Sequence, residues 1–211
     1  IALLVFVPGF VDAGDKQGEK KNILLITESK GFRHGCVARK VTVFAMELVP
    51  RTTRGQALDV LSSQASIAGY KAVIEGAGKL GKIFPLMMTA AGTIQPAKVV
   101  VLGAGNVGWN AAWIAAGMEA EVVLVDKNPD RLRFVDQIHR GRIMTAASNR
   151  GAIERAVVDA DLVIGAVLVA GGRAPVVVSE EMVEQMKPRS VIVDVAVDQG
   201  GCIATTRETT H

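Results

Sequence analysis

The chain has 211 residues, of which 49% are hydrophobic and 21% charged, and its formal net charge is +3. This composition excludes a disordered chain, and the length allows one large or two small domains. Aromatic residues make up only 4%, so we expect no nucleic-acid partner. No apolar run is long enough for a transmembrane helix. Cys36 and Cys202 follow no metal-binding spacing and fit a reducing compartment.

Residues 1–40 differ in character from the rest. The opening IALLVFVPGFVDAG loosely follows a signal-peptide pattern, which leaves secretion open although we expect a cytoplasmic protein. NILLIT then predicts a short buried strand, and ESKGFRHGCVARK predicts a polar loop. Together these two pieces weakly resemble the opening of the ThuA-like family. We expect this atypical segment to be a signal remnant or a foreign piece, with the pair His34 and Cys36 incidental.

Residues 41–97 are expected to form a connecting helix and a linker. VTVFAMELVP predicts a strand that stops at Pro50. In the Ala-rich stretch 54–82, apolar residues at helical spacing predict a buried helical face, and these residues are Leu58, Leu61, Ala65, Ala68 and Ala72. The glycines at 69, 76 and 78 should weaken its later turns. Between Pro85 and Pro96 we expect only a connector.

Strands and helices alternate regularly from residue 98 to the end. Strands are expected at 98–102, 121–125, 142–146, 162–167 and 190–197, and helices at 106–116, 129–139, 149–159 and 179–186. The strands are apolar nearly throughout, as expected when helices cover both faces of a sheet. The pattern predicts an α/β domain at 98–211, a doubly wound parallel sheet of the Rossmann type, preceded by the long connecting helix.

A glycine-rich loop follows the first of these strands. In VVVLGAGNVG, Gly103, Gly105 and Gly108 satisfy G-x-G-x-x-G between a strand and a helix. The first glycine permits a tight turn, the second admits a pyrophosphate, and the third allows close packing of helix and strand. The free N–H groups of the helix start favour that phosphate. The loop therefore predicts dinucleotide binding.

An acid stands at the end of the next strand. Asp126 lies 21 residues after Gly105, where a carboxylate can bind the adenosine ribose hydroxyls and repel a 2′-phosphate. This favours NAD over NADP, although Lys127 and Arg131 nearby weaken the preference. The alternative is that Asp126 only caps the turn before Pro129.

Several stretches resemble known oxidoreductases. VVVLGAGNVGWNAA, VLVDKNPDRLR, ADLVIGAVLVAGGRAP and MKPRSVIVDVAVDQGGCIATTRETTH resemble the NAD-binding domain of alanine dehydrogenase. FAMELVPRTTRGQALDVLSSQASIAGYKAV and FPLMMTAAGTIQPAKVVVLGAG are more similar to the α subunit of proton-translocating nicotinamide nucleotide transhydrogenase. Together the matches cover residues 41–211.

The resemblance implies roles for individual residues. The acid of VDQGG in alanine dehydrogenase is catalytic and lies beside the nicotinamide, and it corresponds to Asp198. Val167 and Leu168 match a loop over the adenosine half of the cofactor. The transhydrogenase motif near the nicotinamide falls on Arg51, Gln56, Asp59 and Ser62. Further expected cofactor contacts are Asn106, Val107 and Val195.

The resemblance implies the reaction of L-alanine, NAD and water to pyruvate, ammonia and NADH. Asp198 would orient or activate the water that attacks an iminium intermediate. Nothing before Val41 resembles the substrate domain, so we expect the chain as given to be incomplete and inactive alone. In the full enzyme we expect L-alanine or pyruvate as substrate and a homo-oligomer. The alternatives are a transhydrogenase α subunit with a membrane subunit as partner, and a non-catalytic NAD-binding module.

Four other residues carry expectations of their own. Trp109 and Trp113 are expected in the core or at a subunit contact, and His139 is expected to serve the end of its helix. Asp194, between valines, is expected to be a buried acid bonded to a neighbouring loop. Cys202 is expected to act as a small buried hydrophobe.

Overall fold

The computed structural model describes residues 59–169 and 173–207. The chain divides into two units, Ile1–Leu61 and Ser62–His211, and nearly all described residues belong to the second. The strands and the loop expected before residue 59 lie outside the described residues. Among the described helices, none is long and apolar enough to cross a membrane.

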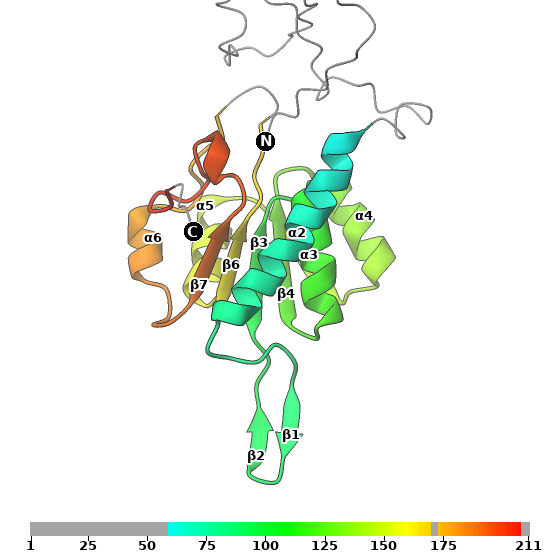
Figure 1. Cartoon of the computed structure of the whole chain (residues 1–211), viewed down its shortest axis with the longest axis vertical. Coiled ribbons are helices and arrows are strands. Elements are labelled where there is room, and N and C mark those ends of the chain that lie inside the picture. Colours follow the sequence, from blue (N-terminus) through cyan, green and yellow to red (C-terminus); the bar gives the residue numbers. More distant parts are fainter. Residues whose placement is uncertain (1–58, 170–172, 208–211) are drawn as a thin grey trace, which may run out of the picture. The chain divides into compact units, whose positions relative to one another are not determined.

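The second unit is built on a five-stranded parallel sheet in the order β5-β4-β3-β6-β7 (Figure 1). The strands are β3 (Lys98–Leu102), β4 (Glu121–Asp126), β5 (Ile143–Ala147), β6 (Leu162–Gly165) and β7 (Val191–Asp194). The helices are α2 (Val60–Lys79), α3 (Asn106–Gly117), α4 (Pro129–His139), α5 (Arg150–Val158) and α6 (Glu180–Glu184). The predicted doubly wound α/β fold is confirmed.

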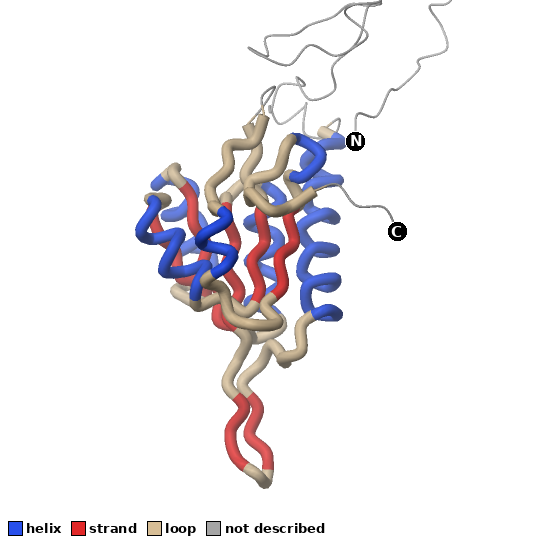
Figure 2. The backbone as a smooth tube through the Cα atoms, turned by 90° about the vertical axis from the view of Figure 1, so that its left-hand side faces the viewer, coloured by secondary structure: helices blue, strands red, loops and turns tan. Residues whose placement is uncertain are grey.

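Helices cover both faces of this sheet (Figures 1 and 2). Val99 and Val101 of β3 pack into a core with residues of α2, α3 and α4. Val100 and Leu102, which point to the opposite face, pack into a second core with residues of α5 and α6. Because both faces are covered, alternate residues of a strand are equally buried, which explains its continuous apolar sequence.

The last two strands are shorter than predicted. β6 ends at Gly165 and β7 at Asp194. The N–H of Val195 makes the last bond between the two strands, to the carbonyl of Gly165, and the next N–H, that of Ala196, donates to the side chain of Asp194. Of the residues expected to continue β7, Val195 and Ala196 form a turn, and Val197 begins the 3₁₀ turn η3 (Val197–Gln199). The motif VDQGG therefore lies beyond the sheet edge and not inside a strand.

The expected connector between Pro85 and Pro96 is a β-hairpin. β1 (Met87–Thr89) and β2 (Gly92–Ile94) pair antiparallel, and all six residues are exposed. Gly92 adopts a φ of +129° at the turn, a conformation that favours glycine. The hairpin extends from the edge of the sheet at which the strands begin (Figure 1).

The buried face of α2 agrees with the predicted one in part. Ala72 is buried as predicted, Leu61 is 42% exposed, and Gly69 and Gly76 also lie against neighbouring elements. A Cβ on Gly69 would overlap the carbonyl oxygen of Val107 in α3, and one on Gly76 would come within 2.7 Å of Leu162. The helix packs through small residues because the backbones approach closely, so Gly69 and Gly76, which were expected only to weaken the helix, belong to its contact face.

His139 has a different partner from the one expected. Its Nε2 accepts a hydrogen bond of 3.1 Å from the indole N–H of Trp109, so it serves an α3 side chain and not the end of α4. Trp109 also stacks on Trp113, with ring centroids 5.9 Å apart. Burial and the nearby Arg142 lower the pKa of His139, which keeps its ring neutral as an acceptor.

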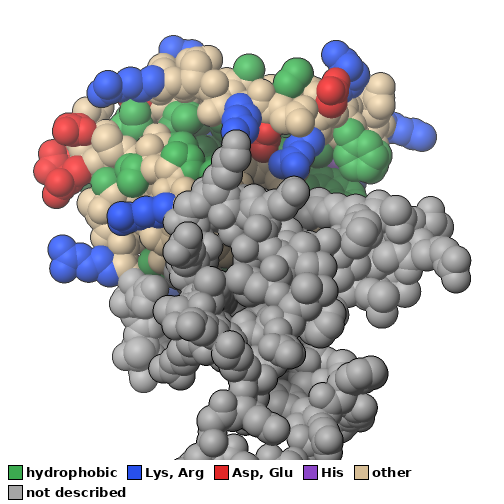
Figure 3. All heavy atoms as spheres, turned by 90° about the horizontal axis from the view of Figure 1, so that it is seen from above, with side chains coloured by type: hydrophobic (Ala, Val, Ile, Leu, Met, Phe, Trp, Pro, Cys, Tyr) green, Lys and Arg blue, Asp and Glu red, His purple; other side chains and the backbone are tan. Residues whose placement is uncertain are grey.

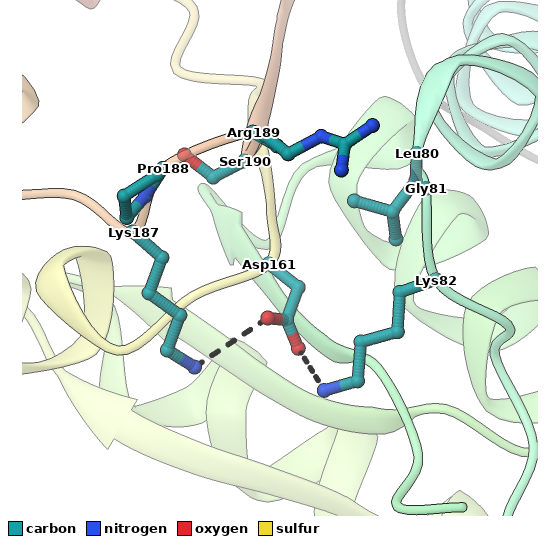
Figure 4. Close-up of a pocket in the computed structure, with 8 residues that line it drawn as sticks. All are labelled: Leu80, Gly81, Lys82, Asp161, Lys187, Pro188, Arg189 and Ser190. Carbon is teal, nitrogen blue, oxygen red and sulfur yellow. Dashed lines mark hydrogen bonds and ion pairs between the residues drawn. The ribbon is translucent and has the colours of Figure 1, made fainter.

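A charged cluster holds together the edge at which the strands begin. Asp161, just before β6, accepts from the N–H of Lys98 at 2.8 Å and pairs with Lys82 at 2.7 Å. Lys187 approaches the other oxygen of Asp161 at 3.5 Å (Figure 4). Burial opposes ionisation of Asp161, but these partners outweigh it and lower its pKa. A cavity of about 180 Å³ beside the cluster is lined by these three side chains with Leu80, Gly81, Pro188, Arg189 and Ser190.

The two glycines of α2 at 69 and 78 provide a matched test of the helix contact. Gly69→Ala should destabilise the domain by about 1–3 kcal/mol, because its Cβ meets backbone that cannot move aside. Gly78→Ala, where a Cβ meets nothing within 4 Å, should stabilise it by about 0.5–1 kcal/mol through helix propensity. Urea unfolding measures both, and a shift in the same direction for the two variants would contradict the packing of α2 on α3.

Candidate functional site

The glycine-rich loop joins the end of β3 to the start of α3. Gly103 has a φ of +102°, and a Cβ there would come within 2.6 Å of the carbonyl oxygen of Ala166. A Cβ on Gly108 would overlap the carbonyl oxygen of Gly103. Both glycines therefore do what the motif predicts, a tight turn at the first and close helix–strand packing at the last.

Gly105 differs from the other two glycines because a Cβ on it would meet nothing within 4 Å. It is the N-cap of α3, and no side chain caps that helix. In contrast, Asn128 and Asn149 accept hydrogen bonds from the first N–H groups of α4 and α5. The first turn of α3 thus keeps N–H groups that an anion can bind, with open space beside them.

Asp126, at the end of β4, is bonded to the glycine-rich loop. Its two carboxylate oxygens accept from the N–H of Ala104 at 2.6 Å and from that of Asn128 at 2.7 Å. The turn-capping alternative therefore describes one of its contacts. A carboxylate has about four acceptor positions, so two bonds leave capacity for ribose hydroxyls. Lys127 follows it directly, Arg131 lies in the first turn of α4, and both are exposed.

Two predicted cofactor residues from distant parts of the sequence meet at the start of α3. The side-chain amide of Asn106 donates to the hydroxyl of Ser62 in α2 at 2.6 Å. One turn further along, Asn110 donates to Ser66 at 3.2 Å. The two helices thus run in the same direction at this contact, and both begin near the cofactor edge. Val107 contributes the carbonyl that approaches Gly69.

Sequence reasoning missed Ser66 and Asn110. Each lies four residues after a predicted site residue, so a polar pair at i and i+4 on both helices was the available signal. These two hydrogen bonds, Asn106 to Ser62 and Asn110 to Ser66, form a polar ladder between α2 and α3 that holds Ser62 and Asn106 in place.

Four of the remaining predicted residues lie after β6 and β7. Val167 and Leu168 follow β6, with Leu168 63% exposed, and Val195 follows β7. The backbone of Asp198 lies in η3. Arg51 and Gln56 fall outside the described residues, and Asp59 directly precedes α2.

The loops after β6 and β7 are bonded to each other. Val177 and Val178 donate their N–H groups to the carbonyl of Cys202, and Ala174 donates to that of Gln199. Asp194, at the end of β7, accepts from the loop that follows it, as expected, but it is half-buried and not buried as predicted. Cys202 is fully buried, as expected for a small hydrophobe.

These segments share one edge of the sheet, the edge at which its parallel strands end. Ligands of open α/β sheets bind at this edge, where successive connections leave in opposite directions. Here that point lies between β3 and β6. Viewed toward this edge, the described part of the chain shows basic side chains at separate places around its outline (Figure 3). Apolar and acidic side chains lie between them (Figure 3). The cavity of Figure 4 lies at the other edge and is not part of this site.

Comparison with known proteins identifies relatives of this chain. Residues 72–211 match the family described as "Alanine dehydrogenase/PNT, C-terminal domain". The chain is 39% identical to the alanine dehydrogenase of Halomonas elongata over 191 residues, which cover 89% of this chain and 51% of that protein. It is 40% identical over 186 residues to an NAD(P) transhydrogenase subunit alpha of Rhodospirillum rubrum, with 77% and 48% covered.

Solved structures agree with these relatives. A transhydrogenase of Sinorhizobium meliloti has a TM-score of 0.73 at 40% identity and covers 82% of this chain and 51% of its own. An L-alanine dehydrogenase has a TM-score of 0.70 at 44% identity, with 79% and 46% covered. The chain spans about half the length of the curated relatives it matches. The chain therefore belongs to the alanine dehydrogenase/PNT family of NAD-dependent oxidoreductases, and it carries the family's C-terminal domain, whose cofactor is NAD.

Proposed function

We propose that this chain supplies the cofactor-binding part of an NAD-dependent enzyme of the alanine dehydrogenase type. The observation that carries this proposal is the open space at Gly105, next to a helix start that no side chain caps. Free N–H groups, a helix dipole and room for close approach are what a pyrophosphate requires. In the strand order this feature lies beside the point between β3 and β6 where successive connections leave in opposite directions.

The described residues would divide the cofactor between them. The first turn of α3 would hold the pyrophosphate, and Asp126 would accept hydrogen bonds from the adenosine ribose. Ser62 and Asn106, which are bonded to each other, would contact the cofactor from the α2 side. Val167 and Leu168, after β6, and Val195, after β7, would contact the cofactor from the other side.

NAD, when bound, accepts the hydride that the substrate loses. The part proposed for this chain is positioning, with Asp198 as the one catalytic residue. In this role the carboxylate of Asp198 orients the water that adds to the substrate carbon and takes up a proton from it. The motif VDQGG and its place at the cofactor edge support this assignment, which leads to the reaction of L-alanine to pyruvate and ammonia.

A transhydrogenase α subunit is the second candidate function. The similarity to the transhydrogenases of Rhodospirillum rubrum and Sinorhizobium meliloti supports it. In that case the partner would be a membrane subunit, and the reaction would be hydride exchange between NADH and an NADP analogue. Such exchange without any turnover of alanine would favour this candidate.

Self-association is proposed for either function. The hairpin exposes apolar side chains of Leu86, Met87, Met88 and Ile94, with Met88 82% exposed. The stretch from Ile83 to Ala97 contains no charged residue, and a lone two-stranded hairpin is marginally stable in water. A second copy of the chain would cover this surface.

The open position at Gly105 gives a direct test of cofactor binding. Gly105→Ala should leave the free energy of unfolding within about 0.5 kcal/mol of wild type, because its Cβ meets no protein atom. It should nevertheless weaken NADH binding about tenfold or more by obstructing the pyrophosphate. Gly108→Ala is the counterpart and should destabilise the fold by about 2–4 kcal/mol. Calorimetry with NADH and thermal unfolding measure these effects, and tight NADH binding by Gly105→Ala would exclude the site.

The role of Asp126 is tested by the ratio of the affinities for NADH and NADPH. Asp126→Ala should weaken NADH binding by about 1–3 kcal/mol through lost ribose hydrogen bonds. Its affinity for NADPH relative to NADH should rise, because a carboxylate no longer repels the 2′-phosphate and Lys127 and Arg131 lie nearby. A general loosening of the loop would weaken both cofactors equally. Asp130→Ala, an exposed acid one turn further on, is the control and should change neither affinity.

The reaction is tested in a complete protein that carries this chain. L-alanine should support NADH formation, and Asp198→Asn should lower kcat by about 10²–10⁴-fold through loss of the general base. NADH binding by that variant should persist. Glu121→Gln, an exposed acid at the beginning of β4, should leave kcat unchanged. If wild-type protein binds NADH but turns over neither alanine nor pyruvate with ammonia, the dehydrogenase assignment is wrong.

A further inference from the structure

The carboxylate of Asp194, at the end of β7, accepts several hydrogen bonds. One of its oxygens accepts from the N–H of Cys202 at 2.9 Å, from that of Ile203 at 3.3 Å and from the hydroxyl of Thr206 at 2.7 Å. The other accepts from the N–H of Ala196 at 3.1 Å. Hydrogen bonds to a charged acceptor are stronger than neutral ones, so this group fixes the backbone around it.

These donors lie on both sides of the turn that carries Asp198. Ala196 directly precedes η3, and Cys202 follows the glycine pair that leaves it. Gly200 and Gly201 have φ values of +98° and +69°, which let the chain reverse within a few residues. Asp194 therefore closes the loop 195–201 at its base, and the geometry of η3 depends on that closure.

Gly165 at the end of β6 makes room for this arrangement. A Cβ at this position would lie 2.5 Å from the sulfur of Cys202 and 2.8 Å from an oxygen of Asp194. Burial and the adjacent Asp194 raise the pKa of Cys202 to about 12. Its thiol thus stays protonated and donates to Asp194 at 3.4 Å, so Cys202 belongs to the closure and not to the chemistry.

The closed loop and Asp126 lie on opposite sides of the glycine-rich loop. Strand order places β4, which ends at Asp126, on one side of the glycine-rich loop, and β6 and β7 on the other. In open α/β sheets a dinucleotide lies across the point at which the strand order reverses. With its adenosine ribose at Asp126, the half that carries the nicotinamide extends toward the loop 195–201.

We propose that Asp194 is a positioning residue that shapes the loop 195–201 as the wall of the nicotinamide half of the cofactor site. The inference rests on the proposed NAD(H)-binding function. Asp194 acts through the loop backbone and through the placement of Asp198. It contributes nothing to the adenosine half, which is held by α3 and Asp126.

The test compares NADH with ADP-ribose, which shares the adenosine and pyrophosphate but lacks the nicotinamide. Asp194→Asn keeps the size of the side chain but turns an amide group toward N–H donors. It should weaken NADH binding about tenfold and change ADP-ribose binding by less than about twofold. Thr206→Val, which removes a single donor to Asp194, should shift the same ratio in the same direction by a smaller factor. Calorimetry on the 211-residue chain gives both dissociation constants.

Asp161→Asn is the matched control, because it removes an acid with a similar number of partners at the opposite edge of the sheet. It should lower the melting temperature and leave the ratio of NADH to ADP-ribose affinity unchanged. All titrations are carried out below the melting temperature of every variant. If Asp194→Asn is too unstable to titrate, Thr206→Val decides the outcome.

The results separate this inference from the function on which it rests. Equal weakening of NADH and ADP-ribose by Asp194→Asn, or an unchanged ratio in Thr206→Val, would overturn the positioning role while NAD(H) binding stands. Failure of the wild-type chain to bind either ligand would overturn the proposed function together with this inference. A selective loss for NADH in the Asp194 variant, absent from Asp161→Asn, supports it.

Discussion

No side chain fits between the first turn of α3 and the end of β3, because a Cβ on Gly108 would overlap the carbonyl of Gly103. This close approach brings the start of α3 down onto the edge of the sheet. Because Gly105 stands at the N-cap, the helix start stays uncapped and open. The placement of the proposed pyrophosphate, and with it the direction of the whole cofactor, follows from this one steric constraint.

Asp126 and Asp194 organise the cofactor edge with the same local geometry. Each ends a strand and accepts from the N–H two residues further on, and each also accepts from a second loop segment. The first arrangement is a side-chain turn that aspartate forms readily. Asp161, at the opposite edge, accepts from one backbone N–H, that of Lys98, and its other partners are lysine side chains. Several backbone donors hold a loop in one shape, whereas lysines on flexible stems mainly neutralise the charge.

The regular part of the domain could be predicted closely from the sequence. The bounds of α4 coincide with the predicted 129–139, and those of β3 with the predicted 98–102. The spacing of apolar residues between turn residues indicates which side chains are buried, and therefore where such elements begin and end. β7 was overestimated since Val195 and Val197 continue the apolar run after the strand has ended. The hairpin was missed because its two strands have three residues each and bury no face.

The site was predictable where a local motif carries the chemistry, as at Gly103, Gly105 and Gly108. The bonds that join distant segments were not. The pairing of Trp109 with His139, and that of Asn106 with Ser62, connect residues 30 and 44 positions apart, and nothing local in the sequence specifies such pairs. The bonding of Asp194 to a neighbouring loop was expected, since a carboxylate between valines needs partners.

The polar ladder between α2 and α3 has a consequence for how the helices stay aligned. Its rungs repeat every four residues on both helices, so a slide of α2 by one turn would set Ser66 opposite Asn106 and form an equivalent bond. Hydrogen bonding alone thus permits more than one alignment. Such a slide would bring Val73 to the place of Gly69, where even a single Cβ overlaps the backbone of α3. The glycine, which makes no polar contact of its own in the ladder, is therefore what selects a single register.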